Sequence, residues 1–162
     1  MSGNAQNIIT GTGSILIDDQ DIGFTTGGVT LRYDLTTIEI EGDQALGIID
    51  RRKSNERLYV TFNALELTLE NMRRFMGLPA GLLTGSCLYL GYNSTCSENS
   101  TSQVELVGEG PNCCNRRWTF PTAVISTGFE IQLQKENPAQ MSVEYEVLKD
   151  GNGRFGFVCD AC

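Results

Sequence analysis

Apolar and polar residues alternate with a period of two between Val29 and Leu35, and Ile38 and Ile40 continue the alternation. A period of two places successive side chains on opposite faces of an extended chain, so this run predicts a half-buried strand. The same alternation returns at residues 58–64 and then shifts its phase, which indicates a bulge or a strand end. The sequence therefore predicts two strands separated by a long polar segment.

Further alternating runs predict strands in the rest of the chain. A short strand is expected at residues 14–18, and the turn at residues 135–138 would join two late strands into a hairpin. The second half is expected to form strands at residues 87–92, 103–107, 117–125, 128–134, 141–148 and 155–158. These runs predict a mainly β fold, an antiparallel β-sandwich or open barrel, in one domain that spans residues 1–162.

One short helix is expected at residues 69–76. Thr68 has the side-chain oxygen of an N-cap, Glu70 lies in the first turn, and Gly77 follows the last turn. The apolar residues of this segment share one face and are Leu69, Met72, Phe75 and Met76. A short helix with one apolar stripe has to lie on the sheet in order to bury that stripe.

The polar segment at residues 41–57 carries charges of both signs. Burying unpaired charges costs several kcal/mol for each ion, so this segment cannot fold back into the core. We expect it to form a long projecting loop, an extended arm that lies in water or against another protein. The arm residues available for contacts between subunits or rings are Glu41, Asp43, Gln44, Asp50, Arg51, Arg52, Lys53 and Glu56.

Charge and composition exclude several classes of protein. The 162 residues include 20 acidic residues, 12 basic residues and no histidine, which gives a net charge of −8. Proteins that grip nucleic acid need clustered lysine and arginine, so specific nucleic-acid binding is not expected. Catalytic Ser-His-Asp and Cys-His arrangements are excluded, and the paired carboxylates fit a solvated strand face better than a glycosidase site. The glycine-rich stretches lack the P-loop lysine, so we expect no enzyme, no catalytic residue and no cofactor.

The N-terminal residues have neither the basic region nor the apolar core of a secretory signal. No apolar run approaches the ~20 residues that a membrane-spanning helix needs, so no membrane partner is expected. The polar loop at residues 93–102 contains two Asn-X-Thr patterns, which are ordinary loop residues if the chain is not exported.

Six cysteines lie in the C-terminal half, and all six are candidates for disulfides: Cys87, Cys96, Cys113, Cys114, Cys159 and Cys162. An even number of cysteines in a short chain is typical of a disulfide framework. Zinc is one alternative, because residues 159–162 have Cys-x-x-Cys spacing and residues 113–114 could supply two more thiolates. Redox chemistry is another. We expect structural thiols or intrachain bridges rather than a metal site.

Four short motifs follow one another in the first half of the chain. They are TGGVTLRY at residues 26–33, DQALGI at 43–48, RKSNE at 52–56 and VTF at 60–62, and the expected helix comes next. In this order and spacing, residues 10–80 resemble the tail tube (major tail) proteins of long-tailed bacteriophages. The C-terminal half, with its cysteines and polar loop, departs from the family pattern.

The resemblance implies a structural subunit of a virion tail, assembled in the host cytoplasm as a homohexamer. The hexameric rings would stack into a tube whose lumen conducts genomic DNA during ejection without binding it specifically, and the long loop would reach a neighbouring subunit or ring. Tape measure and tail terminator proteins are the other partners that the family implies. Acidic side chains would repel phosphates in such a lumen, and the candidates are Glu39, Glu41, Glu130, Glu144 and Glu146.

Tubes of contractile tails, gene-transfer agents and type VI-like secretion systems share the implied fold. An alternative from another class is a monomeric β-sandwich that binds carbohydrate or protein as part of a virion or a secreted protein. Rings or tubes formed by the purified protein would favour the tail tube hypothesis over the binding-module hypothesis.

Overall fold

The computed structural model describes residues 13–41, 47–91, 101–111, 114–133 and 135–162. Its first half contains the short strands β1 (Ser14–Ile17) and β2 (Gln20–Asp21) and the long strands β3 (Thr25–Glu41) and β4 (Ile48–Ala64). Helix α1 (Leu69–Phe75) follows, then a 3-10 turn (Ala80–Leu82) and the small hairpin of β5 (Leu83–Thr84) and β6 (Cys87–Leu88). The second half contains β7 (Ser102–Glu109), β8 (Asn115–Ile125), β9 (Ile131–Gln132), β10 (Gln140–Val147) and β11 (Phe157–Ala161).

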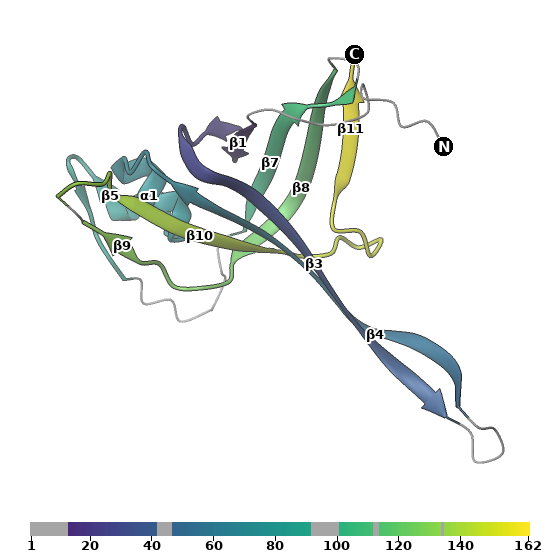
Figure 1. The fold of residues 1–162 in the computed structure, drawn as a ribbon. Coiled ribbons are helices and arrows are strands. Elements are labelled where there is room, and N and C mark those ends of the chain that lie inside the picture. The colour runs from purple at the N-terminus through teal and green to yellow at the C-terminus, as the bar shows by residue number, and fades with distance from the viewer. Residues whose placement is uncertain (1–12, 42–46, 92–100, 112–113, 134) are drawn as a thin grey trace.

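Nine of these strands form one sheet, in the order β2-β1-β7-β8-β10-β4-β3, with β11 beside β8 and β9 beside β10. All of the pairings are antiparallel. Strands β1, β7, β8 and β11 lie together, and β10, β4 and β3 cross them, so the sheet bends around the core (Figure 1). The fold is mainly β and consistent with a β-sandwich, which confirms the predicted fold class.

The bend of the sheet is centred on β8. Residues 115–119 of this strand pair with β11, whereas its last residues pair with β10. Pro121 lies between these two parts, where the pairing of β8 with β7 shifts its register between Ser102 and Val104. Proline has no N–H to donate to a ladder and is tolerated at bulges and edges, so it suits the point where β8 changes partners.

The core contains side chains from both parts of the bent sheet. Val60, Phe62, Met141 and Tyr145 from the β4–β10 part are each at most 1% exposed. From the other part come Ile15 and Ile17 of β1, Val104 of β7, and Phe120 and Ala123 of β8.

Helix α1 confirms the predicted helix and its cap. The Thr68 hydroxyl oxygen accepts a hydrogen bond from the Asn71 N–H (3.1 Å), and Gly77 follows the helix with a φ of 62°. Phe75 is buried and packs against Phe62, with ring centroids 5.8 Å apart. Leu69, predicted to belong to the buried stripe, is 37% exposed, because the face that meets the sheet is centred on Asn71 and Phe75.

Several predicted strands are shorter or shifted. The strand end predicted after residue 64 is confirmed, as is the late hairpin, although β9 has two residues rather than seven. The predicted strand 87–92 keeps two residues, and the last strand begins at Phe157 rather than at residue 155. In the described part of the chain, no helix has the length and hydropathy that a membrane span requires.

Candidate functional site: the projecting β3–β4 hairpin

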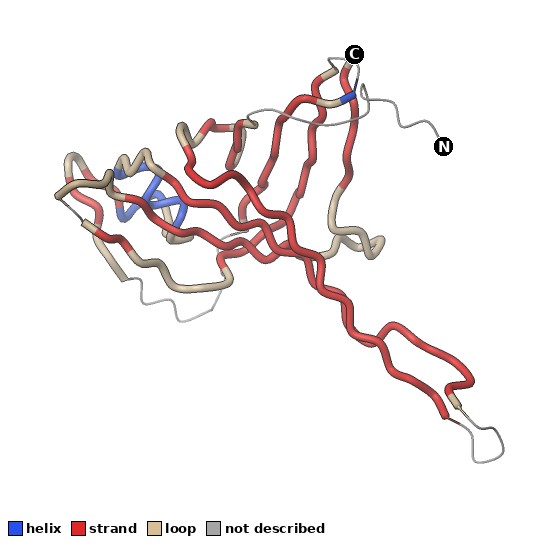
Figure 2. Tube along the Cα trace, in the orientation of Figure 1, coloured by secondary structure: helices blue, strands red, loops and turns tan. Residues whose placement is uncertain are grey.

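Strands β3 and β4 form one long antiparallel hairpin, with partners from Thr25 and Ala64 at its base to Glu41 and Ile48 at its far end. The far half projects from the rest of the molecule (Figures 1 and 2). The prediction of a loop over residues 41–57 is therefore wrong for residues 48–57, which belong to β4. The physical reason is that pairing with β3 satisfies the backbone N–H and C=O groups without burying any unpaired charge.

We define the arm as residues 34–41 of β3 and 48–57 of β4. At ~3.3 Å per residue, eight strand residues extend the arm by roughly 25 Å. Asp43 and Gln44, two of the predicted contact residues, lie outside the described residues. The six other predicted contact residues all lie on the arm, so the structure brings them together on one projecting element.

The arm carries large apolar side chains that the subunit leaves exposed. Ile38 is 55% exposed and Ile49 is 60% exposed, and Leu35, Ile40 and Ile48 are exposed as well. Contiguous exposed apolar residues are characteristic of surfaces that meet another protein. The arm is therefore both charged and apolar, whereas only its polar and charged residues were predicted to form contacts.

The apolar positions change parity in the middle of the arm. They fall on odd-numbered residues from Val29 to Leu35 and on even-numbered residues at Ile38 and Ile40. The change occurs at Thr36–Thr37, where the β3–β4 pairing also shifts its register. A bulge twists and bends a hairpin locally, so the distal arm presents its apolar residues in a new direction.

A cluster centred on Glu56 fixes the base of the arm. Its two carboxylate oxygens accept hydrogen bonds from Lys53 Nζ (2.8 Å) and Lys149 Nζ (2.6 Å). The hydroxyl of Tyr33 is a third partner. Hydrogen bonds from Lys149 first, then from Lys53 and Tyr33, lower the pKa of Glu56 to about 2.

Aromatic contacts support the same cluster from the C-terminal half. Phe155 packs edge-on against Tyr33 with ring centroids 6.4 Å apart, and Lys149 Nζ lies 5.0 Å from the centre of the Phe155 ring. Asp150 accepts hydrogen bonds from the backbone N–H of Arg154 and then of Asn152, which lowers its pKa and shapes the turn that carries Lys149 and Phe155. Nothing in the sequence pattern linked residues 149 and 155 to the arm, because the contact is long-range.

Ion pairs on the arm join register partners across the hairpin and near neighbours within one strand. Arg51 Nη2 lies 2.7 Å from Glu39 Oε1, directly across the hairpin, and Arg52 Nε lies 3.1 Å from Asp50 Oδ2. All four side chains are at least 44% exposed, so each pair contributes about 0–1 kcal/mol. The Glu39–Arg51 pair favours the register of the hairpin because it joins the two strands, whereas the Arg52–Asp50 pair joins residues of β4 alone.

The candidate lumen residues lie in three places. Glu39 and Glu41 are on the arm, Glu130 is in the connection before β9, and Glu144 and Glu146 share one face of β10. Glu144 accepts hydrogen bonds from Ser126 (2.6 Å) and Thr61 (3.3 Å), and Glu146 Oε1 lies 3.9 Å from Arg57 Nε. The lining of a channel depends on how subunits pack in a ring. The assignment of these residues to the lumen therefore stays a prediction.

One disulfide joins Cys114 to Cys162, 48 residues apart in the sequence and with Cα atoms 4.6 Å apart. It ties the end of β11 to the start of β8, beside the Arg116–Asp160 pair, whose two hydrogen bonds are 2.6 and 2.7 Å long. Cys87 and Cys159 are exposed free thiols, and Cys96 and Cys113 lie outside the described residues. Among the described residues, no group of three or more potential ligands lies close enough to hold a metal ion.

No protein-family model matches this chain, and no curated protein matches it. Chains of solved structures do match. Among them is a chain from the cryo-EM structure of the anti-feeding prophage baseplate, determined with six-fold symmetrisation. It is 11% identical in sequence, the match covers 99% of this chain and 97% of that chain, and the TM-score is 0.48.

Proposed function

We propose that the protein is a structural subunit of a phage-type tail tube, and that the arm joins subunits to one another. The observation that carries the proposal is a paired, 17-residue-per-strand hairpin whose distal half is exposed on both faces. A monomeric protein gains nothing in stability from apolar side chains held in water, since hydrophobic stabilisation requires their burial. Burial against another subunit would give these side chains a role.

The cluster centred on Glu56, which we call the clamp, lies at the base of the arm and holds the arm in a fixed direction. Lys149 and Phe155 of the C-terminal half hold Glu56 and Tyr33, so the arm leaves the domain as a stiff extension of the sheet. A directed arm loses less conformational freedom on binding than a flexible loop would, which favours ordered assembly. Repetition of one head-to-tail contact produces a ring or a tube.

In its finer form, the proposal follows the resemblance of residues 10–80 to tail tube proteins. Hexameric rings would stack into a conduit, and a net charge of −8 would let duplex DNA slide past without adhering. No catalytic residue, cofactor or membrane is part of the proposal. Tape measure and terminator proteins would bind at the two ends of the tube.

Electron microscopy of the purified protein in negative stain tests the proposal directly. Wild-type protein is expected to form rings or tubes. Asp34 and Arg57 are register partners, so replacing residues 35–56 with Asn-Gly should close a short hairpin on the intact domain. This variant should be folded by circular dichroism and monomeric by sedimentation.

A control variant keeps the arm and changes the loop that follows β9, for example Glu136→Lys, and should assemble like the wild type. Monodisperse wild-type monomers over a wide range of protein concentration would contradict the proposal. Such monomers would favour the binding-module alternative.

A further inference from the structure

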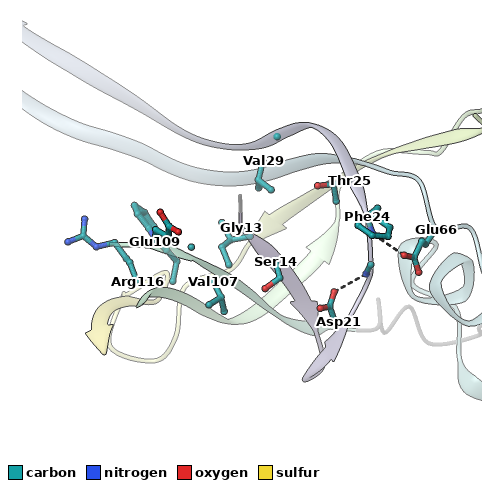
Figure 3. Close-up of a pocket in the computed structure, with 15 residues that line it drawn as sticks. Gly13, Ser14, Asp21, Phe24, Thr25, Val29, Glu66, Val107, Glu109 and Arg116 are labelled. Atoms are coloured by element: carbon teal, nitrogen blue, oxygen red, sulfur yellow. Dashed lines mark hydrogen bonds between the residues drawn. The ribbon is translucent and has the colours of Figure 1, made fainter. Parts of the chain in front are cut away.

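A groove opens between the β1–β7–β8 part of the sheet and the start of β3 (Figure 3), and its volume is about 800 Å³. Val29, Leu106 and Trp118 line it and are partly buried against the core. Phe24 is 74% exposed and also lines the groove. The groove is therefore an apolar hollow that the described residues of the subunit leave open.

Carboxylates lie at both ends of the groove. Asp21 and Glu66 are near one end, and Glu109 is near the other (Figure 3). Asp21 accepts a hydrogen bond from the Gly23 N–H (2.8 Å), and Glu66 accepts one from the Phe24 N–H (3.3 Å). These bonds to the backbone fix the positions of the two carboxylates.

Among the described residues that line the groove, Arg116 is the one with a basic side chain. Its guanidinium is engaged by the carboxylate of Asp160 through two short hydrogen bonds. The field at the groove is therefore negative, and its preferred occupant combines apolar side chains with positive charge.

We propose that the groove receives the arm tip of a second copy of this chain, an inference that rests on the proposed function. The tip, residues 48–53, reads Ile-Ile-Asp-Arg-Arg-Lys, and its three basic residues are paired in the free subunit with carboxylates of the same arm, those of Glu39, Asp50 and Glu56. The pairs of Arg51 and Arg52 are exposed and therefore weak, so these two residues can exchange partners on binding. Ile49 is 60% exposed, and the side chain of Arg52 is 74% exposed. An isoleucine would enter the apolar hollow while Arg51 and Arg52 exchange their exposed carboxylate partners for those at the ends of the groove, Asp21, Glu66 and Glu109.

The tip cannot reach the groove of its own chain. Phe24, Thr25 and Val29 lie at the base of the hairpin, and the arm, which is roughly 25 Å long, begins beyond them at Asp34 and leads away from them (Figure 1). The groove and the tip thus lie at opposite ends of the same hairpin. A contact of this kind is heterologous, and each subunit would insert its tip into the next one, which leaves a free tip and a free groove at the ends of a stack.

Photo-crosslinking in the assembled wild-type background tests the contact. p-Benzoylphenylalanine replaces Ile49, the particles are irradiated, and mass spectrometry maps the linked peptides. Crosslinks between chains to residues 24–29, 106–109 or 116–118 are expected. Crosslinks to another arm or to residues 1–12, in particles that still assemble, would overturn the groove assignment and leave the proposed function standing. Failure of wild-type protein to assemble at all would overturn both.

A charge-reversal series gives a second test. Glu109→Lys should raise the protein concentration needed for assembly about tenfold, whereas the exposed control Glu136→Lys should not. Adding Arg52→Glu to Glu109→Lys should restore assembly, because the charges of tip and rim are then exchanged. Equal assembly of Glu109→Lys and the control would overturn the inference, and so would a double variant no better than Glu109→Lys.

Discussion

Strand β4 lies in two environments along its length, and the comparison explains how the molecule is built. Of residues 58–64, five are buried, and four of these belong to the hydrophobic core, namely Leu58, Val60, Phe62 and Ala64. Of residues 48–57, all are exposed except Glu56, which is partly buried in the clamp at the base of the arm. Both parts pair with β3, and residues 58–64 also pair with β10. Backbone pairing alone therefore maintains strand geometry in the arm, whereas side-chain burial decides which part of β4 stabilises the subunit.

The two parts should therefore respond differently to substitution. Residues 58–64 should determine the free energy of unfolding of the subunit, and the arm should determine assembly. The following variants test that division, in order of their expected effect on the stability of the isolated subunit.

Phe62→Ala should have the largest effect. Phe62 is 1% exposed and contacts the rings of Phe75 and Tyr145, so its removal leaves a cavity and should cost about 3–5 kcal/mol. Urea denaturation followed by circular dichroism measures the loss. Phe24→Ala, a change at a 74% exposed residue, is the control and should stay within about 0.5 kcal/mol of wild type. Equal losses in the two variants would contradict the assigned core.

Replacing Cys114 and Cys162 together with serine should cost about 2–4 kcal/mol, because the bridge closes a loop between residues 48 apart in the sequence. All five residues of β11 are exposed, so this strand has little side-chain burial to keep it on β8. Its backbone amides should exchange hydrogen faster in the variant. Cys87→Ser and Cys159→Ser are the matched controls and should leave both measurements unchanged.

Glu56→Gln should weaken the clamp in a pH-dependent manner. The folded protein holds the pKa of Glu56 at about 2, below its ordinary value of 4.5, so the folded state favours the charged carboxylate. The resulting stabilisation is fully present above pH ~4.5 and is lost as the pH falls toward 2. Wild type should therefore exceed the variant in stability at pH 7, and the gap should close near pH 2. A gap that is the same at both pH values would contradict the assigned cluster.

Replacing Ile38 and Ile49 with serine should have the smallest effect on the subunit, within about 0.5 kcal/mol for each residue, because both side chains already lie in water. Assembly should nevertheless be lost, since the surface proposed to bind a second copy is removed. Sedimentation and electron microscopy measure this outcome. Destabilisation as large as that of Phe62→Ala would show that the arm belongs to the folding core.

Local signals in the sequence were accurate where local chemistry decides the structure. The helix begins after Thr68 because that side chain caps it, and β4 ends at Ala64, where the apolar alternation loses its phase. The arm was placed in the right region, because unpaired charges cannot enter the core. The strand at residues 48–57 was not predicted, because polar and apolar side chains do not alternate along this segment.

The sequence of β3 also contains a signal for the bulge. The apolar positions change parity at Thr36–Thr37, which is where the hairpin shifts its register. By contrast, nothing in the spacing of six cysteines selects Cys114 and Cys162 as partners. That pairing depends on β11 lying beside β8, a contact between segments about 40 residues apart.

Side-chain patterns along the chain are enough to specify the mainly β class, the helix with its cap, and the presence of a charged segment that has to leave the core. Each of these follows from side-chain periodicity or from the cost of burying charge, which act over a few residues. Only the tertiary structure decided the length of the paired arm, its clamp to Lys149 and Phe155, and the groove beside Trp118. These features join residues far apart in the chain, and only the folding of the sheet places such residues within reach of one another.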